Sequence, residues 1–187
     1  MTTVVVTCGA LALHVKGIAR RRGWDVDVRA LPPELHNRPE RIPGQVTDCY
    51  EEDERVVLAY ADCGTAGALD GYPRLEGEHC YDVFGREEVR EALAEQPGTY
   101  FLTDYLVRGF DRVVWRGLGL DRHPELRDDY FKHYRRVVWL AQQPTDELRA
   151  GAEQAAARLG LTLETVETGE GGLEAALAEL VGAGARG

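Results

Sequence analysis

Two cysteines with matching surroundings are the residues of this chain best suited to chemistry. Cys8 and Cys63 each follow an apolar run, and each is followed directly by a glycine. Glycine lets the backbone turn sharply and come close to a ligand. Where a helix begins after such a turn, its positive end lowers the pKa of the thiol and favours the thiolate, the form that binds metals and attacks electrophiles. The pattern therefore predicts a functional role for both sulfur atoms.

A third thiol, Cys80, lies beside His79 in the longest stretch of the chain that lacks a regular apolar pattern. Three thiolates with an open position, or with an added imidazole, suit Zn²⁺. Three cysteines would also serve an iron–sulfur cluster with one substrate-accessible iron, by extension from the usual Cys₄ ligation. We therefore expect a zinc or iron–sulfur site on Cys8, Cys63, Cys80 and His79. The chain has no Cys-x-x-Cys pair, so the alternative is that each cysteine is a small buried hydrophobe, as we expect for Cys49.

Polar residues in neighbouring loops are candidates for binding a substrate. The loop after the second apolar run carries two arginines, whose planar fork suits a carboxylate or a phosphate. The alternative is that they pair with Glu40 and with the acidic helix expected after it. The segment Cys63–Gly67 is expected to form an anion nest of backbone N–H groups. The candidate substrate-binding residues are His36, Asn37, Arg38, Arg41, Gly64 and Thr65.

Two aspartates, Asp62 and Asp104, stand at the ends of predicted strands. An aspartate in this position can act as a general base or can orient a metal ligand through a hydrogen bond. The alternative is a structural role in a turn or a helix cap, and we expect Asp104 to cap the helix that follows it.

Apolar runs that alternate with helical patterns predict a parallel sheet wrapped by helices. The strands are expected at residues 3–8, 25–31, 55–61, 100–103, 137–141 and 161–166. The helices are expected at residues 9–22, 40–52, 86–95, 104–116, 121–134, 147–159 and 173–180. Right-handed crossovers then give a three-layer, doubly wound α/β fold with a mostly parallel sheet of five to six strands in the order 2-1-3-4-5. Ligands bind such sheets where the strand order reverses, which is between the strands that carry Cys8 and Cys63.

The length and net charge of the chain limit the classes of protein to which it can belong. A chain of 187 residues fits a single domain over residues 1–187, and we expect residues 182–187 to fray. The net charge of −10 argues against nucleic acid and against anionic membrane surfaces as partners. The apolar start lacks a basic leader and is shorter than the ~20 residues that span a bilayer. We therefore expect a cytoplasmic protein, whose four cysteines stay free of disulfides.

Five phrases of the sequence together resemble one bacterial and archaeal family, which is catalogued as a domain of unknown function. They are Cys8–Leu11, Leu35–Glu40, Tyr60–Thr65, His79–Tyr81 and His123–Arg127. The resemblance spans nearly the whole chain. Members are often encoded near corrinoid-dependent methyltransferase components, which implies a role in one-carbon or corrinoid methyl transfer. The family supplies no catalytic residues, and the chain lacks the cobalamin motif Asp-x-His-x-x-Gly.

Three functions remain open at this point. The first is a thiolate-ligated metal protein, with zinc or an iron–sulfur cluster, that acts on a small anionic or thiol-bearing substrate. The second is a metal-free accessory or small-anion-binding protein that partners corrinoid methyltransferase components. The third is a metal-free thiol enzyme with Cys63 as the nucleophile.

Overall fold

The computed structural model describes residues 2–182, so the predicted frayed tail lies outside the described residues from residue 183 onward. The chain divides into two compact units. Unit 1 comprises residues 1–84 and 170–187, and unit 2 comprises residues 85–169. Whether the two units unfold as the single domain expected from the length stays a prediction.

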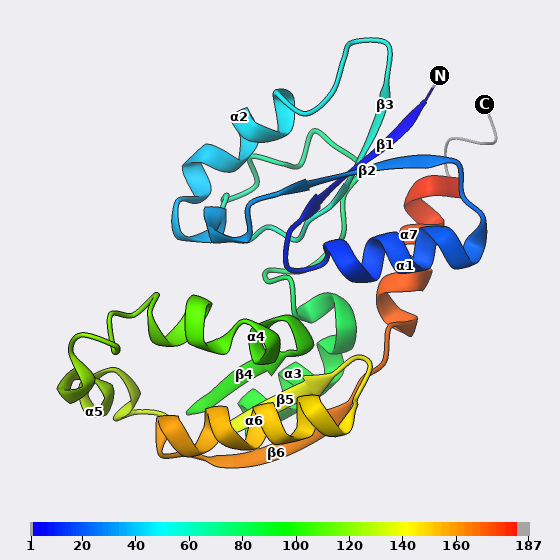
Figure 1. The fold of residues 1–187 in the computed structure, drawn as a ribbon. Coiled ribbons are helices and arrows are strands. Elements are labelled where there is room, and N and C mark those ends of the chain that lie inside the picture. Colours follow the sequence, from blue (N-terminus) through cyan, green and yellow to red (C-terminus); the bar gives the residue numbers. More distant parts are fainter. Residues whose placement is uncertain (1, 183–187) are drawn as a thin grey trace. The chain divides into compact units, whose positions relative to one another are not determined.

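Unit 1 is built on a parallel three-stranded sheet in the order β2-β1-β3 (Figure 1). Its strands are β1 (Thr3–Cys8), β2 (Val26–Leu31) and β3 (Arg55–Ala59), and its helices are α1 (Ala12–Arg22), α2 (Ile42–Thr47) and α7 (Gly171–Gly182). The central strand reads Val-Val-Val because it is buried on both faces, as parallel strands are. Helices α1 and α7 lie on one side of the sheet and α2 on the other.

Unit 2 is built on a second parallel sheet in the order β4-β5-β6. Its strands are β4 (Thr99–Thr103), β5 (Arg136–Ala141) and β6 (Thr162–Glu167), and its helices are α4 (Asp104–Arg108), α5 (Arg127–Phe131) and α6 (Asp146–Leu159). Short 3-10 or π turns add Pro33–Asn37 and Pro39–Arg41 to unit 1, and Asp111–Trp115 and Pro124–Leu126 to unit 2. Helix α3 (Asp82–Glu95) is interrupted by extended backbone at Gly85, where unit 2 begins.

The α/β class, the parallel pairing and the order 2-1-3 are confirmed. The expected continuation of this sheet into strands four and five is wrong, because β4 pairs with β5 and β5 with β6 in a separate sheet. The reason lies at the outer edge of β3. Leu58 donates its N–H to Pro73 and accepts from Leu75, so the segment around Arg74 occupies the backbone groups that a further strand would need.

Several element ends follow the sequence, and three helices do not. Gly23 and Gly160 end α1 and α6 in the left-handed conformation, as expected. The predicted helices at 40–52, 104–116 and 121–134 are each reduced to short pieces. The cap of α4 is the Thr103 hydroxyl, which accepts from the N–H of Leu106, so the prediction that Asp104 is the cap is wrong. No helix in residues 2–182 combines the length and apolar character needed to cross a bilayer.

Candidate functional site

Three thiols of unit 1 meet beyond the carboxyl end of β1. Cys8 is the last residue of β1, Cys63 lies in the loop after β3, and Cys80 lies shortly before α3. Two backbone hydrogen bonds join the loops that carry the second and third thiols: Asp62 donates to Gly77 at 2.9 Å, and Cys63 donates to Glu78 at 2.8 Å. These bonds bring together cysteines that are 17 residues apart in the sequence.

The sulfur atoms are close enough to interact directly. The distance between the Sγ atoms of Cys63 and Cys80 is 3.1 Å, and the Cys80 thiol is also hydrogen-bonded to Cys8. Cys8 is 4% exposed, whereas the other two are half-buried. The phenol of Tyr60, which is 1% exposed, hydrogen-bonds to Cys8 from the residue after β3. The site is thus a cluster of three thiols and one buried tyrosine, called the thiol cluster below.

The hydrogen bonds make Cys8 the thiolate of the thiol cluster. Bonds from the Cys80 thiol, the Ala10 N–H, the Tyr60 hydroxyl and the Leu11 N–H lower the pKa of Cys8 from 9.0 to about 7, against the opposing effect of burial. The bonds to Cys63 and Cys8, together with burial, raise the pKa of Cys80 well above its usual value. Burial and the neighbouring thiols likewise raise the pKa of Tyr60. The thiolate form of Cys8 is therefore favoured by a thiol and a phenol that keep their own protons.

The turn that presents Cys63 is held by the side chain before it. Asp62 accepts from the N–H of Gly67 at 2.8 Å, from the Thr65 hydroxyl at 3.0 Å and from the N–H of Ala66 at 3.2 Å. These bonds lower the pKa of the Asp62 carboxyl group. The carboxylate occupies N–H groups that we expected to form an anion nest for a ligand. Asp62 therefore supports the thiol cluster by fixing a loop.

Cys63 itself adopts a strained conformation, with φ at 49°. A left-handed backbone costs a residue other than glycine about 1–3 kcal/mol, and such residues concentrate at functional sites. The Asp62 hydrogen bonds and the pairing of Cys63 with Glu78 hold this conformation in place. In this conformation the Cys63 sulfur lies against that of Cys80.

The loop with the candidate substrate-binding residues lies beside the Cys63 turn. A Cβ atom added to Gly64 would stand 3.5 Å from Cγ of Pro39, which places the two loops in contact. The Arg38 and Arg41 side chains form no ion pair or hydrogen bond with any described residue, so the alternative of pairing with Glu40 is not seen. His36, by contrast, bonds through Nδ1 to the carbonyl of Pro33 at 2.6 Å. Asn37, Arg38 and Arg41 are exposed to solvent.

The remaining candidates have other partners. The His79 imidazole stacks on Tyr81 with 4.9 Å between ring centroids, and its Nδ1 atom lies 3.9 Å from the Asp82 carboxylate. Cys49 is half-buried against the core, and burial raises its pKa, in line with the structural role expected for it.

Asp104 belongs to unit 2, where it joins the ends of β4 and β5. Its carboxylate accepts from Gln143 N–H at 2.8 Å, from Trp139 Nε1–H at 3.0 Å and from Gln142 N–H at 3.2 Å. The side chain is fully buried. This carboxylate thus has a structural role in unit 2.

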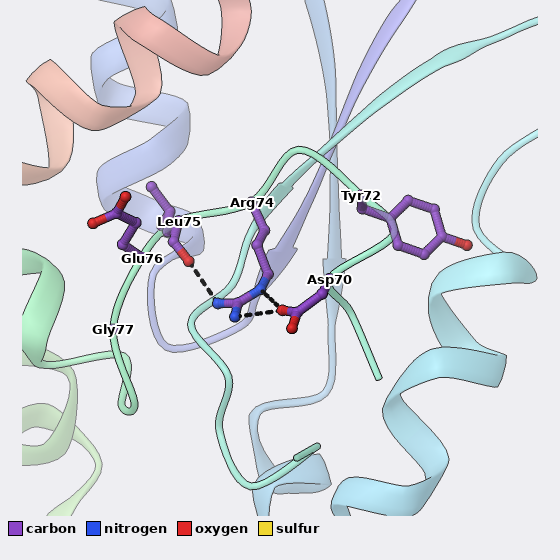
Figure 2. Close-up of a pocket in the computed structure, with 6 residues that line it drawn as sticks. All are labelled: Asp70, Tyr72, Arg74, Leu75, Glu76 and Gly77. Atoms are coloured by element: carbon purple, nitrogen blue, oxygen red, sulfur yellow. Dashed lines mark hydrogen bonds and ion pairs between the residues drawn. The ribbon is translucent and has the colours of Figure 1, made fainter. Parts of the chain in front are cut away.

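A pocket of about 330 Å³ lies along the segment that leads to Cys80. It is lined by Asp70, Tyr72, Arg74, Leu75, Glu76 and Gly77 (Figure 2). The guanidinium of Arg74 donates twice to Asp70, at 2.7 and 2.9 Å, and once to the carbonyl of Leu75. Since its cation is already satisfied, this pocket is not prepared for an anion, and the thiol cluster remains the better candidate.

Tyr60 is the residue of the site that sequence reasoning missed. It ends a run of small and β-branched residues, Val-Val-Leu-Ala, three positions before Cys63. A bulky residue with a hydroxyl group at the end of a buried strand needs a hydrogen-bond partner there, and this was the available signal.

Among the described residues, no group of three or more His, Cys, Asp or Glu side chains is arranged to hold a metal ion. The thiols instead satisfy one another by hydrogen bonding. Residues 30–177 match the family described as "Protein of unknown function (DUF1638)". The chain belongs to this family, which confirms the resemblance to a family of unknown function. No curated protein and no solved structure matches the chain.

Proposed function

We propose that this protein binds a single Zn²⁺ ion through the thiolates of Cys8, Cys63 and Cys80. The observation that carries the proposal is the convergence of three thiols from three separate segments, with 3.1 Å between two of the sulfur atoms. Thiolates are the ligands that soft and borderline metals prefer. Three protein ligands leave a fourth position for a substrate, as in catalytic zinc sites.

The spacing of the sulfur atoms favours one ion over a cluster. Two thiolates on one tetrahedral zinc, each at ~2.3 Å from the metal, stand ~3.8 Å apart. The three thiols are not prearranged as a metal site among the described residues, so the proposal requires their side chains to rotate on binding. Cys63 and Cys80 need to separate by less than ~1 Å from their 3.1 Å spacing. In an iron–sulfur cluster the thiolates bind different irons and stand farther apart, so that alternative requires a larger rearrangement.

Binding would exchange protons for the metal. At neutral pH Cys8 already approaches its thiolate form, whereas the raised pKa of Cys80 keeps that thiol protonated. The ion must therefore displace the protons of the other thiols, so affinity would rise with pH. The hydroxyl of Tyr60, hydrogen-bonded to Cys8, would orient that ligand and moderate its charge.

The substrate class follows from the loop beside the thiol cluster. Arg38 and Arg41 are exposed cations without a partner among the described side chains, and Pro39 between them contacts the Gly64 turn. A small molecule with an acidic group and a thiol or oxygen donor would use both features, because the open zinc position polarises such a donor. Free thiols suit a reducing compartment such as the cytoplasm, and the net charge of −10 disfavours nucleic acid as a partner.

Metal analysis of protein purified without oxygen tests the proposal. We expect one zinc per chain, lost in Cys8→Ser, Cys63→Ser and Cys80→Ser. Cys49→Ser is the matched control, since Cys49 packs against the core of the same unit, and it should retain the metal. If the analysis finds stoichiometric iron and inorganic sulfide, the site holds an iron–sulfur cluster and the zinc proposal is wrong. Absence of any metal from protein that also fails to bind added Zn²⁺ would reject both.

The unpaired arginines favour a second function, a metal-free accessory protein that binds a small anion and partners corrinoid methyltransferase components. Here Arg38→Ala should abolish binding of an anionic ligand or of the partner, and the serine variants should retain it. Arg20→Ala is the control, because Arg20 is another exposed arginine of unit 1 with no side-chain partner among residues 2–182. Loss of binding in the serine variants would contradict this reading.

A further inference from the structure

We propose that Cys63 and Cys80 form a redox-active dithiol, which a small-molecule disulfide oxidises to an intramolecular disulfide. The inference concerns the metal-free protein and does not depend on zinc binding. It assigns different roles to the three thiols of the cluster.

The distance between the two sulfur atoms favours a disulfide. The 3.1 Å between the Sγ atoms of Cys63 and Cys80 exceeds the ~2.05 Å of a disulfide bond by about 1 Å. The backbones on both sides are already joined by the bonds from Asp62 to Gly77 and from Cys63 to Glu78. Bond formation therefore needs a small side-chain movement and no change in the pairing of the loops.

Exposure also favours Cys63 as the thiol that reacts first. Cys63 is half-buried and can meet a small oxidant, whereas Cys8 is only 4% exposed. Cys80 then needs to reach only the adjacent Cys63 sulfur.

The chemistry proceeds in two exchange steps. Cys63 loses its proton to solvent, and its sulfur attacks one sulfur of the small disulfide RSSR, which forms a mixed disulfide and releases RS⁻. Cys80 then loses its proton to solvent, its sulfur attacks the Cys63 sulfur, and the second RS⁻ leaves. Both thiolates released take up protons from water. In sum, two protein thiols are oxidised and RSSR is reduced to two RSH.

The test uses full-length metal-free protein, prepared with a chelator, and oxidised glutathione as the probe. Each cysteine lies in its own tryptic peptide, with Cys63 in residues 56–74 and Cys80 in residues 75–86. Mass spectrometry after alkylation of free thiols should find these two peptides joined in the oxidised sample. Peptides with Cys8 and Cys49 should be alkylated. A mixture dominated by pairs that include Cys8 or Cys49, or by thiols that stay reduced, would overturn the inference.

The variant Cys80→Ser tests the order of the two steps. We expect glutathione to remain on Cys63 in this variant, because no second thiol displaces it, whereas Cys49→Ser should form the cross-link as the original protein does. Cys80→Ser protein that carries no glutathione on Cys63 would contradict this order. Zinc binding is measured separately on reduced protein, so failure of one proposal leaves the other standing. If both hold, bound zinc must block the cross-link.

Discussion

Replacing Tyr60 by phenylalanine isolates one interaction of the thiol cluster. The phenol is 1% exposed, so the phenyl ring fills nearly the same space and only the hydroxyl bonded to Cys8 is lost. A hydrogen bond to a charged group contributes about 1.5–3 kcal/mol. At 1.36 kcal/mol per pKa unit this corresponds to about 1–2 units. The variant should therefore move the pKa of Cys8 from about 7 to between about 8 and 9.

The far-ultraviolet absorbance of the thiolate, followed against pH in metal-free protein, measures this shift. Tyr72→Phe is the matched control, because Tyr72 bonds to Tyr50 at 2.9 Å and leaves Cys8 untouched. Cys8→Ser should remove the titration step near neutral pH altogether. If Tyr60→Phe titrates like the original protein while Cys8→Ser loses the step, the hydroxyl does not stabilise the thiolate and the assignment of Tyr60 is refuted.

Three further predictions concern stability. The free energy of unfolding of the metal-free protein should rise by up to about 2.7 kcal/mol between pH 7 and pH 9. In this pH window the folded chain has released the Cys8 proton and the unfolded chain has not. Denaturant titrations at several pH values measure the rise, which should be absent from Cys8→Ser. Gly9→Ala should lower the free energy of unfolding by about 1–3 kcal/mol, since its Cβ would stand 2.8 Å from the Leu31 carbonyl oxygen. Gly44→Ala is the control: its Cβ meets nothing within 4 Å, so it should not lower the free energy of unfolding by this amount. Asp104→Ala should lower it by about 3 kcal/mol or more, because three N–H donors, two of them buried, lose their acceptor. Thermal unfolding that matches the original protein would contradict that role.

The sequence was sufficient for the strands of unit 1 up to β3 and for the end of α1. The buried run Val4–Val6, the left-handed Gly23 and the apolar run of β3 are local patterns, and each was read correctly. The sheet boundary depended on a long-range pairing. The backbone of Pro73 and Leu75 pairs with Leu58, and a segment without alternating apolar residues carries no local sign that it will line the edge of a strand.

The sequence likewise predicted only part of the candidate site. Cys8 and Cys63 follow adjacent parallel strands, so topology alone placed them at the same edge of the sheet. The sequence could not select the role of Asp62, because an aspartate at the end of a strand can fix a turn, act as a general base or orient a metal ligand. Its hydrogen bonds to Thr65, Ala66 and Gly67 decide for the turn. The backbone of Cys63 beside this turn is left-handed, a conformation that residues other than glycine rarely adopt and that the sequence did not predict.

The close packing of the thiols restricts the states that the cluster can adopt. Cys8 and Tyr60 are buried, and like charges this close in a medium of low polarity cannot all ionise. A single thiolate is stable there because Cys80 and Tyr60 keep their protons and donate hydrogen bonds to it. A second or third thiolate requires compensation, which a divalent cation supplies, and a disulfide removes two thiols from the balance entirely. The protonated, metal-bound and oxidised forms thus each avoid repulsion between neighbouring thiolates. Because the three forms exclude one another, conditions that favour one of them should deplete the other two.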